Sequence, residues 1–304
     1  MKERLDFDAM AKRLLQNGRR KRVAVAAPED EHTGEVIGRC LNEGMADFVL
    51  FARREKAGKA DELAALSPGH VETVLTDTPE EAARMAVTAV REGRADVLMK
   101  GTLNTDVLLR AVLDKENGLL IPGHTLSHIT AAHIPQYDKL VLFSDAAVIP
   151  RPDTEQFDAI LRYALNVFRR LNGDEDTPRV ALIHCTEKTS EKFQHTLSYA
   201  ELKRRAAEGR YGRTAIDGPM DVKTACDSES ARIKGLTSDV TGKADILIFP
   251  NIEAANTFYK TITLFAGATT AGMLCGTVAP VVIASRADST EAKMGSLLLA
   301  CNMA

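Results

Sequence analysis

The chain has 304 residues, of which 45% are hydrophobic and 27% charged, and its formal net charge is −3. This composition is that of a folded globular protein with one large or two modest domains, and it excludes a disordered chain. The slight acidity argues against the basic surface that nucleic-acid-binding proteins carry. No apolar run reaches 18 residues and the start of the chain has no apolar h-region, so we expect neither a membrane span nor a secretory signal.

Apolar runs of four to six residues alternate with longer segments of helical period. This alternation predicts an α/β fold with a largely parallel sheet. The expected strands are 22–26, 48–51, 71–75, 97–99, 140–143, 180–184, 246–249 and 281–284. The expected helices include 33–42, 80–92, 106–113, 154–171, 191–208 and 289–301, with a further helical stretch around Asn256.

A Gly-x-Ala-Asp motif occurs three times, beginning at Gly44, Gly93 and Gly242, and each copy leads into an apolar strand. We interpret each glycine as a left-handed residue at a helix end, followed by a tight turn into the next strand. The unequal spacings exclude a solenoid repeat, so the motif supports repeated βα units only.

The first polar segment with chemical potential follows the strand at 97–99. Because it links a strand to a helix, its free amides are expected to point toward a ligand at the strand's carboxyl end. Glycine permits close backbone approach, and the polar side chains could bind an anion, although an N-cap role for Asn104 or Thr105 is the alternative. The segment lacks a Walker A sequence, so no nucleoside triphosphate is indicated. Its candidate residues are Lys100, Gly101, Thr102, Asn104 and Thr105, with Arg110 on the following helix.

The end of the chain carries the strongest signal. An apolar strand delivers Ser285 and Arg286 side by side at its carboxyl end, directly before a helix. A hydroxyl, a guanidinium and helix amides together form a site suited to a doubly charged phosphate. Asp288 and Glu291 match a capping box, so a capping role for Asp288 stands beside a catalytic one.

Other polar residues are more ambiguous. Asn251 and Asn256 follow the buried strand at 246–249 and are either caps or ligands, as is Glu253 between them. His124 and His128 are four residues apart, but no carboxylate or cysteine nearby completes a ligand set with them or His133. We therefore expect no metal site. Five scattered cysteines without a C-x-x-C pair indicate reduced thiols in a cytoplasmic protein.

Taken together, segments 98–105, 143–147, 217–221, 242–251 and 285–289 resemble, in the same order, those of the phosphate acetyl/butyryltransferase family. This family exchanges an acyl group between coenzyme A and inorganic phosphate. Lys100-Gly101, the 285–289 segment and the short chain resemble the butyryl enzymes more than the acetyl enzymes.

The resemblance implies two α/β/α domains of isocitrate/isopropylmalate dehydrogenase-like fold with a cleft between them. We place domain one at 1–121 with 276–304, and domain two at 122–275. Arg286 and Arg110 would clamp phosphate, and Ser285 would stabilise developing charge during direct attack in a ternary complex. The implied small-molecule partners are acyl-CoA and phosphate, and the implied assembly is a homo-oligomer. Coenzyme A is a substrate, and no cofactor is implied.

The resemblance also exposes one departure. Acetyl enzymes place an aspartate, often assigned as the general base, six residues after the motif arginine, where this chain has Ala292. Asp288, Asp145 and Glu291 are the substitutes available. The alternatives to a butyryltransferase are a phosphate acetyltransferase, a dehydrogenase of the same fold and a non-catalytic CoA-binding protein. The dehydrogenase alternative lacks the G-x-G-x-x-G fingerprint of a nicotinamide site.

Overall fold

The computed structural model describes residues 6–16, 18–284 and 288–304. Its chain divides into two compact units. Unit 1 comprises Phe7–His124 and Ala271–Ala304, and unit 2 comprises Thr125–Thr270. Each unit combines mostly parallel strands with helices, as the alternation of apolar runs predicted.

Unit 1 is built on strands in the order β3-β2-β1-β4-β11-β10, parallel except for β10. The strands are β1 (Lys21–Ala26), β2 (Ala46–Arg53), β3 (Val71–Thr76), β4 (Val97–Lys100), β10 (Thr269–Cys275) and β11 (Val281–Val282). The helices are α1 (Phe7–Gln16), α2 (Glu31–Glu43), η1 (Arg54–Lys56), α3 (Gly58–Leu66), α4 (Pro79–Arg91), α5 (Thr105–Val112) and α11 (Thr290–Met303).

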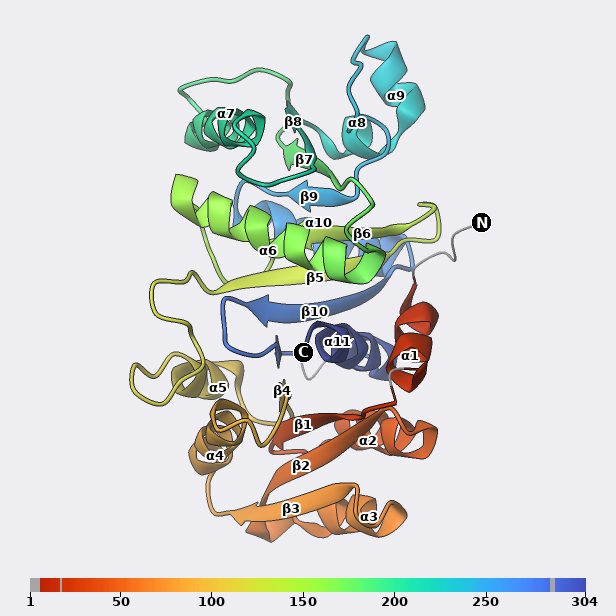
Figure 1. Ribbon diagram of the computed structural model, residues 1–304, viewed down its shortest axis with the longest axis vertical. Helices are drawn as coiled ribbons and strands as arrows, with labels where there is room; N and C mark the ends of the chain where they lie inside the picture. Colours follow the sequence, from red (N-terminus) through yellow and green to blue (C-terminus); the bar gives the residue numbers. More distant parts are fainter. Residues whose placement is uncertain (1–5, 17, 285–287) are drawn as a thin grey trace. The chain divides into compact units, whose positions relative to one another are not determined.

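The strand order of unit 1 reverses beside β1. From β1 the chain moves outward through α2 to β2 and through α3 to β3, and then returns through α4 to β4 on the other side of β1. Because parallel crossovers are right-handed, this reversal puts α2 and α3 on one face of the sheet and α4 on the other. Helix α11 packs with α1 and α2, while α5 packs beside α4 (Figure 1). The carboxyl ends of β1 and β4 therefore form a topological switch point, where ligands bind in open α/β sheets.

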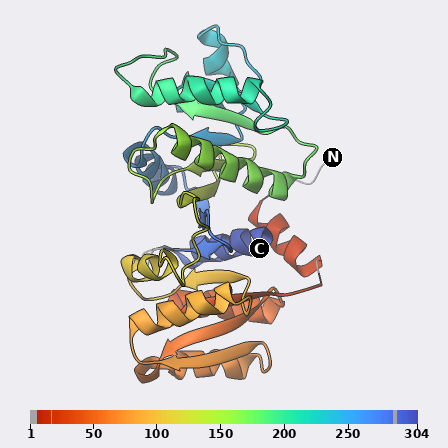
Figure 2. The same cartoon turned by 60° about the vertical axis from the view of Figure 1, so that its left-hand side comes forward.

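Unit 2 has the strand order β5-β6-β9-β7-β8, parallel except for β5. The strands are β5 (Ser127–His133), β6 (Leu140–Ser144), β7 (Arg179–Ile183), β8 (Ala215–Met220) and β9 (Ile246–Ile248). The helices are α6 (Thr154–Asn172), α7 (Gln194–Ala207), α8 (Val222–Cys226), α9 (Ser228–Ile233) and α10 (Ile252–Phe265). Helices α6 and α7 lie side by side (Figures 1 and 2).

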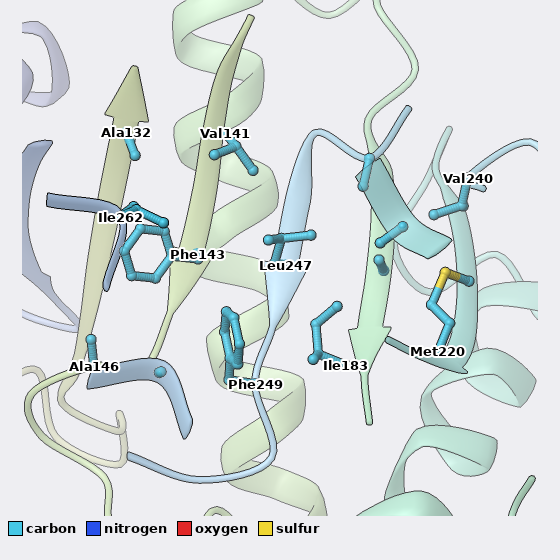
Figure 3. Close-up of a cluster of buried hydrophobic side chains, with 14 residues drawn as sticks. Ala132, Val141, Phe143, Ala146, Ile183, Met220, Val240, Leu247, Phe249 and Ile262 are labelled. Carbon is cyan, nitrogen blue, oxygen red and sulfur yellow. The ribbon is translucent and has the colours of Figure 1, made fainter. Parts of the chain in front are cut away.

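The core of unit 2 is an apolar cluster beneath the strand ends that carry its polar loops. Phe143 of β6 and Leu247 of β9 are fully buried in it, with Ile262 of α10 closing the cluster (Figure 3). Phe143 meets Phe249 and Phe258 edge-on, at ring-centroid distances of 6.2 and 5.2 Å. Edge-to-face pairs of this kind add to the free energy gained by burying the rings. The cluster thus fixes the ends of β6 and β9.

The repeated Gly-x-Ala-Asp motif works largely as predicted. Gly44, the C-cap of α2, and Gly93, the residue after the C-cap of α4, have φ values of 72° and 73°, and Gly242 has a φ of 75°. Gly242 lies in a turn well after α9, however, and not at a helix end. The motif aspartates anchor neighbouring strands: Asp96 accepts a 2.8 Å hydrogen bond from the amide of Arg22.

All eight predicted strands are present, while β5, β8 and β10 were not predicted. Their segments lack a clear apolar run: β8 contains Gly218-Pro219, and β10 contains Gly272. Hydrogen bonding to neighbouring strands supports these three strands in place of strong local propensity. Helices α1, α3, α8 and α9 were likewise outside the prediction, and α7 begins at Gln194 instead of position 191.

Candidate active site

The loop after β4 is drawn tightly against the end of β1. The amide of Gly101 donates to Ala26 O at 2.9 Å, and the amide and hydroxyl of Thr102 both donate to Ala27 O, at 2.7 and 3.0 Å. A Cβ on Gly101 would lie 2.0 Å from Ala27 O, so only glycine fits there. The close backbone approach predicted for Gly101 is therefore to the protein's own β1 end.

Lys100 shapes this loop from inside. Its side chain is buried, and its Nζ donates to the carbonyl oxygens of Gly101 at 3.1 Å and Leu103 at 3.2 Å. These bonds turn two loop carbonyls toward the ammonium, while the amides of Gly101 and Thr102 are bonded to the end of β1. Lys100 thus organises the loop in this structure, whereas the sequence suggested direct substrate binding.

The remaining loop residues lie at the start of α5. Asn104 is exposed at the N-cap position, and among the described residues its side chain makes no capping bond to that helix. Thr105 is the first residue of α5 and is half-buried. Asn104 thus occupies the N-cap position, as the capping alternative predicted, but its side chain does not cap the helix.

A cavity of about 320 Å³ opens at the switch point between β1 and β4. Glu29 on its wall is buried and holds Arg53, whose Nε lies 2.8 Å from each carboxylate oxygen. Hydrogen bonding to Glu29 raises the pKa of Arg53, so the guanidinium stays charged. The full lining is Ala27, Glu29, Arg53, Lys56, Pro79, Glu80, Thr102, Leu103, Asn104 and Val107.

Arg110 lies on the solvent side of α5, with 80% of its side chain exposed, and pairs with Asp106 at 3.2 Å. It lines a groove of about 240 Å³ beside Arg84 of α4. Glu80 and Val107 line both this groove and the strand-end cavity, so the two adjoin. The predicted phosphate ligand Arg110 is thus accessible, and its pairing with Asp106 is a surface pair of small energetic worth.

Ser285 and Arg286, the two residues on which the sequence argument depends most, lie outside the described residues. The described chain resumes at Asp288, which is half-buried. The N-cap of α11 is Ser289, whose hydroxyl accepts from the amide of Ala292 at 3.2 Å. The predicted capping box of Asp288 and Glu291 is therefore wrong, because extended backbone continues one residue further and serine is an equally good cap.

Asp145 follows β6 in unit 2, and its carboxylate is buried in its own fold. Oδ2 accepts from the Ser127 hydroxyl at 2.9 Å and the His128 amide at 3.0 Å, while Oδ1 accepts from the amides of Ala147 and Val148, each at 2.9 Å. Four donors hold this carboxylate in place. In this structure Asp145 organises the loop after β6.

The two asparagines of the site prediction have similar local roles. Asn251 is the N-cap of α10 and accepts from the amide of Ala254 at 2.8 Å. Asn256 donates from Nδ2 to Ala146 O at 3.1 Å, which ties α10 to the loop of Asp145. The structure brings Asn256 and the Asp145 loop together in unit 2, and gathers the Lys100–Thr105 residues in unit 1.

Sequence reasoning missed a buried ion pair at the start of α11. Lys293, with 3% of its side chain exposed, donates to Asp30 Oδ1 at 2.8 Å and to the Thr33 hydroxyl at 3.3 Å. Burial works to raise the pKa of Asp30, but the bonds from Lys293 and Thr33 outweigh it and lower the pKa. The detectable signal was a lone lysine at the start of the apolar run of α11.

Comparison with known proteins shows the family to which the chain belongs. Residues 68–301 match the family described as phosphate acetyl/butaryl transferase. The chain belongs to this family. It is 36% identical to the phosphate butyryltransferase of Clostridium beijerinckii, over 98% of each chain. It is 35% identical to the phosphate acetyltransferase of Thermotoga maritima, over 94% of this chain and 96% of that one.

The structural comparison agrees with this family membership. A branched-chain phosphotransacylase from Enterococcus faecalis V583 superposes with a TM-score of 0.81 at 27% identity, covering 93% of this chain and 98% of that one. The described residues contain no helix long and apolar enough to cross a membrane. Nor do they contain a group of three or more His, Cys, Asp or Glu side chains placed to hold a metal ion.

Proposed function

We propose that this protein is a phosphate acyltransferase of the butyryl type. It converts butanoyl-CoA and phosphate into butanoyl phosphate and coenzyme A. The observation that carries this proposal is the 36% identity to a phosphate butyryltransferase over 98% of both chains. The acetyl enzyme of Thermotoga maritima matches almost as well, so acetyl-CoA is the alternative substrate.

The proposed chemistry is direct transfer in a ternary complex. Arg286, with Arg110 as a second cation, binds the phosphate, and Ser285 with nearby amides stabilises the charge that develops on the acyl carbonyl oxygen. Asn104 and Thr105 at the start of α5 offer polar groups at the carboxyl end of β4. Fixing both reactants removes much of the entropic cost of their encounter. Asn251, Asn256 and Asp145 support the proposal as residues that shape the strand ends of unit 2.

Among the carboxylates considered as the base, two have their lone pairs engaged. Asp145 accepts four hydrogen bonds. Bonds from its own amide and from Ser289 lower the pKa of Glu291, which weakens it as a base. We keep Asp288 as the carboxylate candidate, because it lies two residues after Arg286.

The deciding experiment is an assay of free thiol. Purified protein with butanoyl-CoA and phosphate should release coenzyme A, with or without EDTA and without added nicotinamide. Absence of thiol release with acyl groups of two to five carbons would reject the proposal. Two extra methylenes in an apolar site are worth about 1.6 kcal/mol, so kcat/KM should favour butanoyl-CoA over acetyl-CoA on the order of tenfold. An equal or higher value for acetyl-CoA would select the acetyl alternative.

We also propose that the enzyme acts in the cytoplasm as a homo-oligomer, with no metal or redox cofactor. Its five cysteines are all free thiols, which supports a reducing compartment. Size-exclusion chromatography with light scattering tests the oligomer, since a monomer at micromolar concentration would contradict it.

A further inference from the structure

A chain of hydrogen bonds joins the first turns of α2 and α11 in unit 1. His32 Nδ1 lies 3.0 Å from the hydroxyl oxygen of Thr290, and that hydroxyl lies 2.8 Å from Glu35 Oε2, to which it donates. Because the Thr290 hydroxyl donates its only proton to the carboxylate of Glu35, Nδ1 of His32 must be the donor in the contact between His32 and Thr290. In the neutral ring, Nε2 then carries the lone pair. His32 is exposed, so this nitrogen is open to a substrate.

The hydrogen bonds between His32, Thr290 and Glu35 lie at the sheet edge where the sequence predicts the reaction site. Helix α2 starts after the carboxyl end of β1 and α11 after that of β11, and β4 with the Lys100 loop lies between these two strands. Thr290 follows Arg286 by four residues. Both helix starts therefore lie at the sheet edge where open α/β sheets bind ligands.

The two helix starts are held together rigidly. The buried pair of Lys293 and Asp30 joins α11 to the N-cap of α2 one turn below Thr290. Thr290 itself is buried. A base must be held by such neighbours if it is to meet a small reacting group in the correct geometry. The ion pair and the hydroxyl together restrict where the His32 ring can lie.

We propose that His32 is the general base and acid for coenzyme A in this reaction, an inference that rests on the proposed function. In the direction of acyl-CoA synthesis, Nε2 takes the proton from the CoA thiol. The thiolate forms the C–S bond to the acyl carbonyl carbon and the bond from that carbon to the phosphate oxygen breaks. The departing phosphate takes up the proton from the imidazolium and leaves as hydrogen phosphate, which restores the neutral base. In the opposite direction the imidazolium returns its proton to the departing CoA thiolate.

The surrounding charges suit this role. The charged groups around the ring include Glu35 on α2, which is linked to it through Thr290, and Glu291 on α11, on which the charge of Arg39 on α2 also acts. Lys293 behind them is paired with Asp30. A carboxylate that acts through a hydrogen bond orients an imidazole and stabilises the imidazolium that forms. Histidine changes charge between pH 5 and 8, which is the range an efficient general base requires. This arrangement would supply the proton acceptor that is missing at Ala292.

The test is His32→Asn, since the asparagine amide can still donate to Thr290 while the accepting Nε2 is lost. With butanoyl phosphate and coenzyme A at pH 7, we expect kcat to fall by about 10²-fold with an unchanged urea midpoint. A free thiol ionises with a pKa of about 8.5, so the deficit should shrink as the pH rises to 9.5. Thr290→Val should give a smaller fall in kcat with little change in KM, because the base would lose only its orientation. His70→Asn is the matched control, because His70 also uses Nδ1, 2.8 Å from Asp47, but lies at the opposite sheet edge.

Each outcome decides the proposal. Full activity of His32→Asn, or a deficit that is the same at every pH, overturns it, the latter because a structural defect would not depend on thiol ionisation. A pH-dependent deficit in Asp288→Asn without one in His32→Asn assigns the base to Asp288 instead. If the wild-type protein transfers no acyl group, the proposed function itself fails, which the wild-type assay shows before any variant is compared.

Discussion

The two units use the polar residues at their strand ends in different ways. In unit 2, the carboxylate of Asp145 accepts four hydrogen bonds, and the side chains of Asn251 and Asn256 bond to local backbone. In unit 1, Asn104 and Arg110 are exposed, and Asp30 has one buried oxygen, Oδ2, without a hydrogen-bond partner in the described part of the chain. The contrast indicates that the polar side chains at the strand ends of unit 2 stabilise its own fold, whereas more of those in unit 1 remain accessible for binding and catalysis.

The largest expected effect is that of Asp145→Ala on stability. The substitution leaves three part-buried amides and a buried hydroxyl without their acceptor, and each group that stays buried and unsatisfied costs about 1–3 kcal/mol. We expect the free energy of unfolding to drop by about 3 kcal/mol or more in urea denaturation. Asp138→Ala, an exposed aspartate of the same unit, should change it by less than about 0.5 kcal/mol. An Asp145→Ala protein that is stable but inactive would break the comparison, because Asp145 would then be catalytic.

Arg286→Ala should act on activity and leave stability intact. Loss of a charge-assisted contact to phosphate costs about 1.5–3 kcal/mol, which is roughly a ten- to hundredfold fall in kcat/KM. Arg286→Lys should be less severe, since it keeps the charge but not the bidentate geometry. Arg94→Ala, which removes an arginine paired with Glu92 at the amino end of β4, serves as the control. Near wild-type kinetics for Arg286→Ala would mean that phosphate binds elsewhere.

Gly101→Ala tests whether the loop after β4 must lie against β1. The new Cβ would lie 2.0 Å from Ala27 O, so the loop must shift, at a cost of about 1–3 kcal/mol. We expect a lower urea midpoint together with a higher KM for phosphate. Gly58→Ala adds the same methyl group where no atom lies within 4 Å, and should be neutral or slightly stabilising. Similar behaviour of the two variants would show that the tight loop is not needed.

A pH dependence of stability is expected to arise in unit 2. Burial, with His184 as the second cause, lowers the pKa of His195 to about 4, and the two rings meet at 3.0 Å. Because the unfolded chain protonates first, near pH 6.5, this stability is complete above pH 6.5 and is lost as the pH falls toward 4. Urea midpoints measured from pH 7.5 to 4 should therefore decline, and His195→Gln should flatten the decline, whereas exposed His124→Gln should not. An unchanged slope in His195→Gln would remove this pair from the account of acid stability.

The sequence alone could predict most of the fold. Apolar runs located eight strands to within a few residues, because a buried parallel strand must be apolar along its whole length. It could not predict β8 or β10, whose glycine and proline residues have low strand propensity and which form only beside a neighbouring strand. The N-cap of α11 was predicted one residue too early, at Asp288 instead of Ser289, because aspartate and serine are interchangeable as caps.

What the sequence determined by itself is the family and the segments that carry its chemistry, since these are local patterns with a direct chemical meaning. Lys100, Asp145 and Asn256 were recognised as special, but only the tertiary structure decided that their side chains bond to the protein's own backbone. The same is true of Lys293 with Asp30 and of His32 with Thr290, which are 263 and 258 residues apart in the chain. No local pattern encodes such pairs, because a hydrogen bond depends on distance in space, and only the packing of α11 against α2 makes that distance short.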